Sequence, residues 1–580
     1  MRPAIAWLCA AAALSSCARA VRNEATPALA PNAPDAAARQ AAALDPDAGP
    51  PLSTREQIDH ALSRLTFGAR PADRERVARI GVAAFIEEQL HPERIADAPL
   101  AKELASIPVL HRNPGDLTQE LVRFRREKRE EKQAAATAMT SVVGMAPGPD
   151  EPAMDEAQAP DPNIGVSAPA HVPRELHKQL GKAGRGPGFE MVAQLTQAKL
   201  LRAVASGKQL QEVMTDFWFN HFNVFAGKDN EAALLPSYEQ AIRERALGNF
   251  GDLLTATARH PAMLVYLDNW RSATPLRPRG RRARRGPERG LNENYARELL
   301  ELHTLGVDGG YTQQDIVEVA RCFTGWTIAE PQRDPRYVFR PGMHDPGVKH
   351  VLGYEIRGGG EDDGKQVLDI LAHHPSTAHF IATKLARRFV ADDPPEALVQ
   401  RVAETFLRTD GDIRSMLRTI FESPEFWSRR ALLAKVRSPL ELVAGSVRAL
   451  GARVSDPMAL GRAIARIGEP LFAAQPPTGY VDAAETWLSP GAVLARIDFG
   501  LALADGQLDG VTVDLSPLSR DANAPEEVLD RAAAQLGAPA LSEKTREYVL
   551  AQLREAPPGP DVVPARAVGL LLGSPELQRR

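Results

Sequence analysis

Apolar side chains recur at helical spacing through most of the chain. Ile58, Leu62 and Leu65 form an apolar stripe on a helix that starts near residue 53. The segment 212–225 (EVMTDFWFNHFNVF) has apolar residues on nearly all sides, which predicts a helix deep in a core. Similar patterns occur over 117–138, 236–246, 250–259, 365–372, 376–390, 395–409, 413–422 and 439–450. The sequence therefore predicts an all-α protein with a multi-helix globular body.

One stretch has a strand-like pattern. Residues 336–352 predict a small β-hairpin that turns around Pro341-Gly342. Shortly before it, Thr312 is followed three residues later by Asp315, which predicts a cap at the start of a helix that ends near Phe323.

Two stretches of low apolar content interrupt the helical pattern. The segment 139–173 is rich in Pro, Ala and Asp, and the segment 271–289 holds eight arginines with Pro and Gly. Both are typical of disordered insertions. The predicted organisation is a signal peptide at 1–17, a disordered tether at 18–52, an N-terminal helical half at 53–360 that carries both insertions, and a C-terminal helical half at 361–580.

The first residues follow the pattern of a bacterial lipoprotein signal. A positive start precedes an apolar segment, 5–14, that is too short for a permanent membrane helix. Leu14-Ser15-Ser16-Cys17 matches the lipobox, in which cleavage before Cys17 leaves a lipidated cysteine. The alternative is ordinary signal-peptidase cleavage after Ala18-Arg19-Ala20. Either pathway predicts export, and lipidation predicts an anchor in the outer membrane at the periplasmic face of the envelope.

Composition and charge argue against nucleic acid and a charged membrane surface as general partners. The net charge of −4 gives no general attraction to nucleic acid or to a membrane surface. The arginines of 271–289 could contact phosphates, but no aromatic residues lie between them to stack on bases, so we expect no nucleic-acid partner. The mixed charges of 117–138 predict a solvated helix face, with partner binding as the alternative.

The densest group of polar and reactive side chains lies in 290–305 (GLNENYARELLELHTL). On a helix, Glu298 and Glu301 lie about 5–6 Å apart, which is close to the carboxylate spacing of retaining glycosidases. However, two carboxylates on one helix reach a substrate from the same side. The alternative is an ion-pair ladder from Glu293 through Arg297 to Glu301. The candidate catalytic residues are Asn292, Asn294, Arg297, Glu298, Glu301 and His303.

Histidines offer candidate ligands for a divalent metal, although none has a recognised spacing. The candidates are His221, His344 and His350. The alternative for His221 is a core histidine that bonds a backbone carbonyl, because aromatic residues surround it in the sequence. The cofactor content therefore stays open.

The cysteines and the missing motifs give no support for a disulfide, a nucleophilic thiol, a serine hydrolase or a nucleotide-binding loop. If Cys9 leaves with the signal peptide and Cys17 carries lipid, Cys322 has no partner for an intrachain disulfide. Its apolar surroundings favour a buried, inert thiol. The sequence contains neither a G-x-S-x-G elbow nor a phosphate-binding glycine loop.

Several motifs together resemble one family. They are HALSRLTFGARP (60–71), FWFNHFNV (217–224), GLNENYARELLELHTLGVDGGYTQQDI (290–316), ARCFTGW (320–326), SPEFW (423–427), KVRSPLELV (435–443), QPPTGY (475–480), VLARIDF (493–499) and LGSPELQ (572–578). The chain resembles the domain-of-unknown-function 1800 family of exported bacterial proteins. The resemblance implies a mainly α-helical, exported protein, and the family has no established biochemical activity.

Two function classes remain open, and the sequence does not decide whether the protein is an enzyme. In the first, it is an assembly or interaction factor of the cell envelope. Similar family members are often encoded beside a sulfatase-like exported protein, which suggests a partner. In the second, it is an envelope hydrolase built on the polar helix at 292–303, either with or without a divalent metal.

Overall fold

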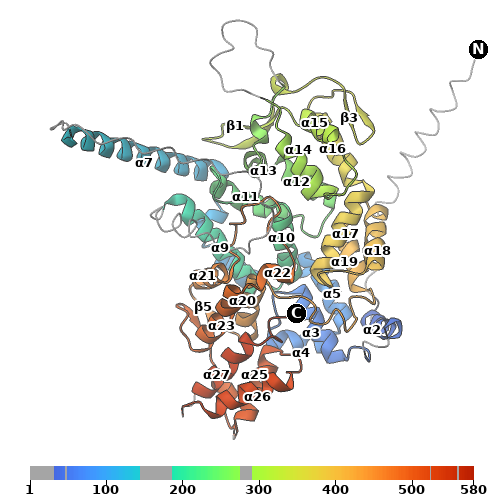
Figure 1. The fold of residues 1–580 in the computed structure, drawn as a ribbon, viewed down its shortest axis with the longest axis vertical. Coiled ribbons are helices and arrows are strands. Elements are labelled where there is room, and N and C mark those ends of the chain that lie inside the picture. The colour runs from blue at the N-terminus through green and yellow to red at the C-terminus, as the bar shows by residue number, and fades with distance from the viewer. Residues whose placement is uncertain are drawn as a thin grey trace, which may run out of the picture.

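The chain folds mainly into helices, which confirms the all-α prediction (Figure 1). The computed structural model describes residues 30, 32–45, 49–143, 186–274, 290–522, 524–557, 559 and 561–580, with only the backbone over 136–143. Cys17, the signal peptide and most of both predicted insertions lie outside these residues. Over the described ranges, no helix is both long and apolar enough to cross a bilayer.

Caps and apolar stripes define the first helices. The Ser53 side chain accepts a hydrogen bond from the Glu56 N–H, and the Glu56 carboxylate accepts one from the Ser53 N–H (2.8 Å). This capping box starts α3, as its apolar stripe predicted, and Leu62 and Leu65 are fully buried. The elements are α2 (Ala33–Leu44), α3 (Thr54–Leu65), α4 (Pro71–Ile80), α5 (Val82–Leu90), η2 (Pro92–Arg94), α6 (Ala98–Leu104), η3 (Pro108–Leu110) and α7 (Pro114–Val143).

Residues 33–44 belong to the predicted disordered tether, and for them that prediction is wrong. They form α2, in which Ala37 and Ala38 are buried. Asp45, at the end of this helix, pairs with Arg430. Alanine has the highest helix propensity and loses no side-chain entropy on burial. An alanine-rich stretch with few large apolar residues can therefore still pack as a helix.

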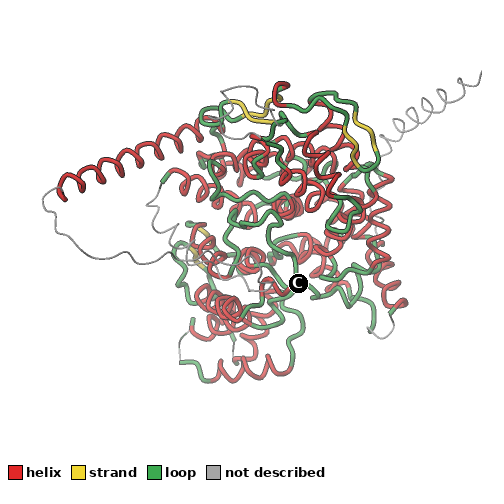
Figure 2. Tube along the Cα trace, turned by 45° about the horizontal axis from the view of Figure 1, so that its top comes forward, coloured by secondary structure: helices red, strands yellow, loops and turns green. Residues whose placement is uncertain are grey.

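Helix α7 projects from the body (Figures 1 and 2). Its first turns are anchored by Leu117 and Leu121, which are buried with Met191 in a small separate core. Residues 125–135 are exposed, as the mixed-charge pattern predicted. These residues form an exposed arm.

The central helices surround an aromatic core. Helix α10 lies deep in it, as predicted, with Trp218 fully buried beside Phe222 and Phe250. The Trp218 indole N–H donates to the Ala246 carbonyl (3.0 Å), so its polar atom is satisfied. The elements are α9 (Pro187–Ala205), α10 (Gln209–His221), α11 (Glu231–Arg243), α12 (Phe250–Arg259), α13 (Pro261–Tyr266), η4 (Asn269–Arg271), α14 (Glu293–Glu298), η6 (Leu299–Thr304) and α15 (Gln313–Cys322).

The predicted hairpin over 336–352 is wrong in its pairing. Its two strands exist as β2 (Arg336–Phe339) and β3 (Lys349–Val351), but they belong to different antiparallel pairs. β2 pairs with β1 (Trp326–Ala329), and β3 pairs with β4 (Tyr354–Ile356). The Pro-Gly sequence forms the short helix η7 (Pro341–Met343) instead of a hairpin turn. The predicted cap of α15 is confirmed, because Thr312 and Asp315 form a capping box.

The C-terminal helices share one hydrophobic core with the N-terminal ones. The core extends from Ala37 to Leu577, so no break in it marks the predicted boundary at residue 360. The elements are α16 (Glu361–Ala372), α17 (Pro375–Phe389), α18 (Glu396–Arg408), α19 (Ile413–Phe421), α20 (Pro439–Ala449), β5 (Arg453–Val454), α21 (Pro457–Ile467), α22 (Ala484–Trp487), α23 (Pro490–Ala504), β6 (Val511–Thr512), α24 (Ser516–Ser519), α25 (Pro525–Leu536), α26 (Glu543–Arg554) and α27 (Val562–Gly573). β5 and β6 pair antiparallel.

A buried ionic cluster joins distant parts of this body. Glu441 of α20 lies 2.7 Å from Arg388 of α17 and 3.0 Å from Arg580. All three side chains are buried. Burial alone would raise the pKa of Glu441, but the two guanidinium groups outweigh it and hold the pKa at about 2.

Replacing Glu441 should destabilise the fold strongly. In Glu441→Gln, Arg388 and Arg580 lose their buried carboxylate, and we expect a loss of about 3–5 kcal/mol in the free energy of unfolding at pH 7. Because the folded pKa lies below the unfolded value, this contribution is present above about pH 4.5 and disappears as the pH falls toward 2. Denaturant unfolding from pH 8 to pH 3 measures both effects. The exposed Glu547→Gln serves as the control, and an equal, pH-independent loss in both variants would contradict this role.

Candidate functional site

Asn292 caps the start of the predicted polar helix. Its Oδ1 accepts a hydrogen bond from the Asn294 N–H (2.9 Å), and its Nδ2 donates to the Leu267 carbonyl (2.7 Å). Both ends of the side-chain amide are therefore used inside the protein. Asn294 is exposed.

The helix predicted over 290–305 has two forms, α14 and the π-helix η6. At the end of η6 the Leu305 N–H donates to the Leu300 carbonyl five residues earlier (2.8 Å). The wider turn shifts the angular position of each later residue around the helix axis. Within the described ranges, the ion pair of Arg297 is with Glu293 and not with Glu301.

Arg297 and Glu301 have separate partners. Arg297 lies 3.9 Å from Glu293 and donates to Gln313 of α15 (3.1 Å), and Gln313 donates to Glu293 (2.8 Å). The Tyr311 hydroxyl donates to Glu301 (3.4 Å). The first step of the ladder alternative is thus present, while Glu301 bonds Tyr311.

Glu298 is half-buried next to these groups. Burial and the neighbouring Glu301 raise the pKa of Glu298, with Arg297 acting in the opposite direction. The Tyr266 hydroxyl donates to the Gln475 carbonyl (2.6 Å), and burial, followed by the Glu298 charge, raises the pKa of Tyr266. Glu298 therefore lies near Tyr266, which bonds the segment that follows α21.

His344 and His350 lie in two other environments. The His344 ring nitrogens contact the Thr324 carbonyl (2.8 Å) and the Asp363 carboxylate (3.1 Å), and Lys349 donates to the same carboxylate (2.6 Å). This cluster is buried and fastens the loop before β3 to α16. His350 is exposed on the β3–β4 hairpin. The structure does not bring either histidine to His221.

His221 and His303 do lie together, with ring centroids 6.1 Å apart. His221 Nε2 lies 3.1 Å from the His303 backbone carbonyl, which can only accept, so Nε2 carries the proton. Burial lowers the pKa of both rings, that of His303 to about 3. His221 is therefore neutral with a lone pair on Nδ1. Within the described ranges, no group of three or more His, Cys, Asp and Glu side chains could hold a metal ion.

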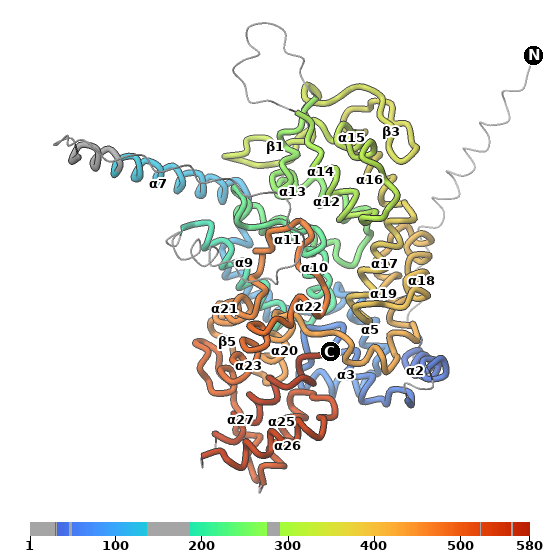
Figure 3. The backbone as a smooth tube through the Cα atoms, in the orientation of Figure 1, coloured from blue at the N-terminus to red at the C-terminus, as the bar shows by residue number. Residues whose placement is uncertain are grey.

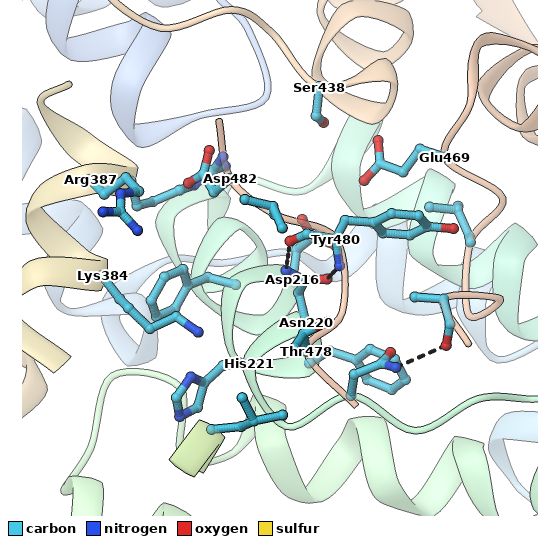
Figure 4. A pocket seen from close by; sticks show the side chains of 18 of the residues that line it. Asp216, Asn220, His221, Lys384, Arg387, Ser438, Glu469, Thr478, Tyr480 and Asp482 are labelled. Atoms are coloured by element: carbon cyan, nitrogen blue, oxygen red, sulfur yellow. Dashed lines mark hydrogen bonds between the residues drawn. The ribbon is translucent and has the colours of Figure 1, made fainter. Parts of the chain in front are cut away.

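A cavity of about 230 Å³ lies beside His221, between α10, α17 and the segment 469–487 (Figure 4). From the polar helix, Leu302 lines this cavity, while none of the six predicted catalytic residues is among its lining residues. Lys384 and Arg387 reach it from α17, and Figure 4 shows Lys384 extending toward His221.

The segment 469–487 lies beside α10 (Figure 3). Two asparagine side chains in and just after α10 bond to the backbone of this segment. Asn220 accepts from the Tyr480 N–H (2.7 Å) and donates to the Tyr480 carbonyl (2.7 Å). Asn223 donates to the carbonyls of Ala474 and Pro476 (both 2.9 Å). This wall of the cavity is therefore bound to a core helix.

The charged side chains around the cavity differ in whether they have an ion-pair partner. Lys199 is paired with Asp216 (2.6 Å). Burial and the nearby Arg387 lower the pKa of Lys384 to about 8, against the opposing effect of Asp482. Burial raises the pKa of Glu469 to about 8, although its carboxylate accepts the Leu440 N–H (2.8 Å). Burial thus shifts the pKa of both groups toward the neutral range, from above for Lys384 and from below for Glu469.

The family model described as "Protein of unknown function (DUF1800)" matches residues 60–579. The chain belongs to the DUF1800 family. No curated protein and no solved structure matches it. Membership therefore confirms the resemblance found in the sequence and assigns no reaction.

In this DUF1800 protein, sequence reasoning missed the residues from α17. Lys384 and Arg387 stand in an ordinary amphipathic pattern (ATKLARRF) that gives no sign of a cavity. The QPPTGY motif at 475–480 did mark the opposite wall, because it was one of the segments that carried the family resemblance.

Cys322 fits its predicted inert role. It is a free, fully buried cysteine. Burial raises the pKa of its thiol to about 12, so the reactive thiolate is suppressed in this DUF1800 protein.

The carboxylate of Glu298 should cost stability at neutral pH. Its folded pKa is raised, so the stability that it contributes is present below its unfolded pKa and is lost as the pH rises through the folded value. We expect Glu298→Gln to increase the free energy of unfolding at pH 8 and to leave it unchanged below about pH 4. Glu301→Gln, which removes the neighbouring charge, should reduce the effect of Glu298→Gln. Unfolding titrations at the two pH values test this, and a Glu298→Gln protein less stable at pH 8 would contradict it.

Proposed function

We propose that this protein is an exported, lipid-anchored factor of the cell envelope that acts by binding another exported protein. The observation that carries this proposal is the projecting arm of α7, residues 125–135, which is exposed along its length. A helix held away from the body without apolar cover is typical of a surface that meets another molecule or solvent.

The arm has the chemistry for an acidic partner surface. Residues 125–132 contain five basic and three acidic side chains. Arg125 is fixed against the body through the Asn230 side chain (2.6 Å), whereas Arg126 and Lys128 contact acidic neighbours on the arm itself. Such exposed ion pairs contribute little to stability, so they can exchange for contacts with a partner.

The polar helix also favours an interaction factor over a pocket enzyme. A hydrolase built on 292–303 requires the carboxylates to face a substrate cleft. Instead Glu293 and Arg297 are linked to Gln313 on the surface, and Asn292 is used as a cap. Similar family members are often encoded beside a sulfatase-like exported protein, and a protein of that kind is the partner that we propose.

The second candidate is an envelope hydrolase, with or without a divalent metal, and the raised pKa of Glu298 favours it. A general acid must keep its proton near the working pH. Elemental analysis of the protein purified without chelator separates the two candidates. Near-stoichiometric metal in the wild type that is lost in Glu298→Gln/Glu301→Gln would support the hydrolase.

Lipid anchoring is tested at Cys17, which lies outside the described residues. We expect the wild type to incorporate labelled fatty acid and to fractionate with the outer membrane. Cys17→Ala should lose both the label and the membrane association. Export without label in the wild type would favour the ordinary cleavage site after Ala20.

The arm is tested by reversing three exposed charges in Arg126→Glu/Arg129→Glu/Lys132→Glu. We expect its affinity for the purified sulfatase-like protein to fall by about tenfold or more, which corresponds to about 1.4 kcal/mol. Higher salt should weaken wild-type binding in the same direction. The measurement is isothermal titration of the two purified proteins.

Arg39→Glu/Arg79→Glu/Lys544→Glu is the matched control for the arm, because it makes the same charge change at exposed sites elsewhere. It should bind as the wild type does. Equal losses in both triple variants, or no binding by the wild type, would contradict the proposal.

A further inference from the structure

Two cations share the cavity beside α10 with the Asp482 carboxylate, which forms its ion pair with Lys435 (2.9 Å) and not with them. Lys384 and Arg387 lie one turn apart on α17, and both line the cavity. Among the described residues, no carboxylate forms an ion pair with either one. The neighbouring cations contrast with them, because Lys199 pairs with Asp216 (2.6 Å) and Arg388 pairs with Glu441 (2.7 Å).

These two cations repel each other in a buried setting, and a bound anion would relieve that repulsion. Burial and the repulsion of Arg387 lower the pKa of Lys384 to about 8, and the nearby Asp482 opposes this shift only in part. Arg387 uses Nε to bond the Asp392 carbonyl (2.9 Å), which orients its planar group and leaves the two terminal nitrogens. A guanidinium with both terminal nitrogens available suits bidentate binding of a carboxylate or phosphate.

His221 also lines this cavity, and its ring has a hydrogen-bond acceptor without a partner. The side chain is 2% exposed, and its Nδ1 has no hydrogen-bond partner within the described part of the chain. Because Nε2 carries the proton toward the His303 carbonyl, Nδ1 can only accept. A buried acceptor without a partner costs free energy. A ligand hydroxyl is the donor that would satisfy it.

The size and walls of the cavity limit the ligand further. Its volume of about 230 Å³ is below the roughly 300–1,000 Å³ of pockets for drug-sized molecules. Phe380 and Trp487 supply apolar wall, and the Lys384 ammonium lies 5.3 Å from the Phe380 ring centroid. These walls favour an organic ligand over a fully hydrated inorganic ion.

We propose that this cavity binds a small hydroxylated organic anion, such as a sugar acid. Lys384 and Arg387 hold its anionic group, and His221 Nδ1 accepts a hydrogen bond from a hydroxyl. This binding site is independent of the α7 arm, so either proposal can fail without the other.

Four probes separate the features of the ligand in isothermal titrations of the full-length protein. D-glucuronate has the charge and the hydroxyls, D-glucose lacks the charge, cyclohexanecarboxylate lacks the hydroxyls, and inorganic phosphate lacks the carbon frame. We expect D-glucuronate to bind with a Kd of about 1 mM or below. Each of the other three should bind at least about tenfold more weakly, the loss that corresponds to one good hydrogen bond or ionic contact.

Variants then assign the binding to the named side chains. Lys384→Met and Arg387→Met should each weaken D-glucuronate binding by about tenfold or more, because each removes one charge-assisted contact. His221→Phe should weaken D-glucuronate and leave cyclohexanecarboxylate unchanged. Lys544→Met removes an exposed lysine charge far along the chain and should bind as the wild type does. Without ligand, Lys384→Met should melt at a higher temperature than the wild type, because it removes a buried repulsion.

Three results would overturn the proposal. The first is the absence of D-glucuronate binding at millimolar concentration. The second is unchanged D-glucuronate binding in folded Lys384→Met and Arg387→Met proteins. The third is binding of D-glucose or inorganic phosphate as tight as that of D-glucuronate.

Discussion

The buried carboxylate of Glu441 is the interaction on which the rest of the body depends. It neutralises Arg388 of α17 and Arg580 of the last segment, two cations that the core could not otherwise contain. The same region holds Lys435, which is 1% exposed and lies 2.9 Å from Asp482. Because Asp482 belongs to the segment 469–487, this ionic network sets the position of α17 relative to that segment. The cavity between them is a consequence of how the charges are buried.

The cavity is assembled from parts that are far apart in the sequence. Asn220 of α10 bonds the backbone of Tyr480, 260 residues later, in both directions. Gly479 allows this approach, since a Cβ there would lie 2.4 Å from the Asn220 carbonyl oxygen and its backbone has a φ of +65°. A core helix thus places one wall and α17 places the other. Functional side chains on such walls are held rigidly, as binding sites require.

Patterns of residues close together in the sequence predicted caps and buried helices correctly. They did not predict the features that depend on contacts between distant parts of the chain. The cap of α15 at Thr312 and the burial of Trp218 follow from residues close in sequence, and both were predicted. The alanine-rich α2 was missed because its stability comes from tertiary contacts, which composition does not reveal. Lys384 lies in an ordinary helical pattern, and its importance comes from the distant groups packed against it, His221 above all. The same limit explains why the polar helix was identified but its role was not.

The polar helix contributes to the cavity through its backbone. The last carbonyls of any helix lack partners within that helix, and His303 lies in the last turn of η6. Its carbonyl accepts the Nε2–H of His221, which fixes the tautomer in which Nδ1 is an acceptor. The π-turn determines where that carbonyl lies. The segment that the sequence marked as chemically rich therefore acts on the cavity by orienting His221, while Glu293 bonds Gln313 and Glu301 bonds Tyr311.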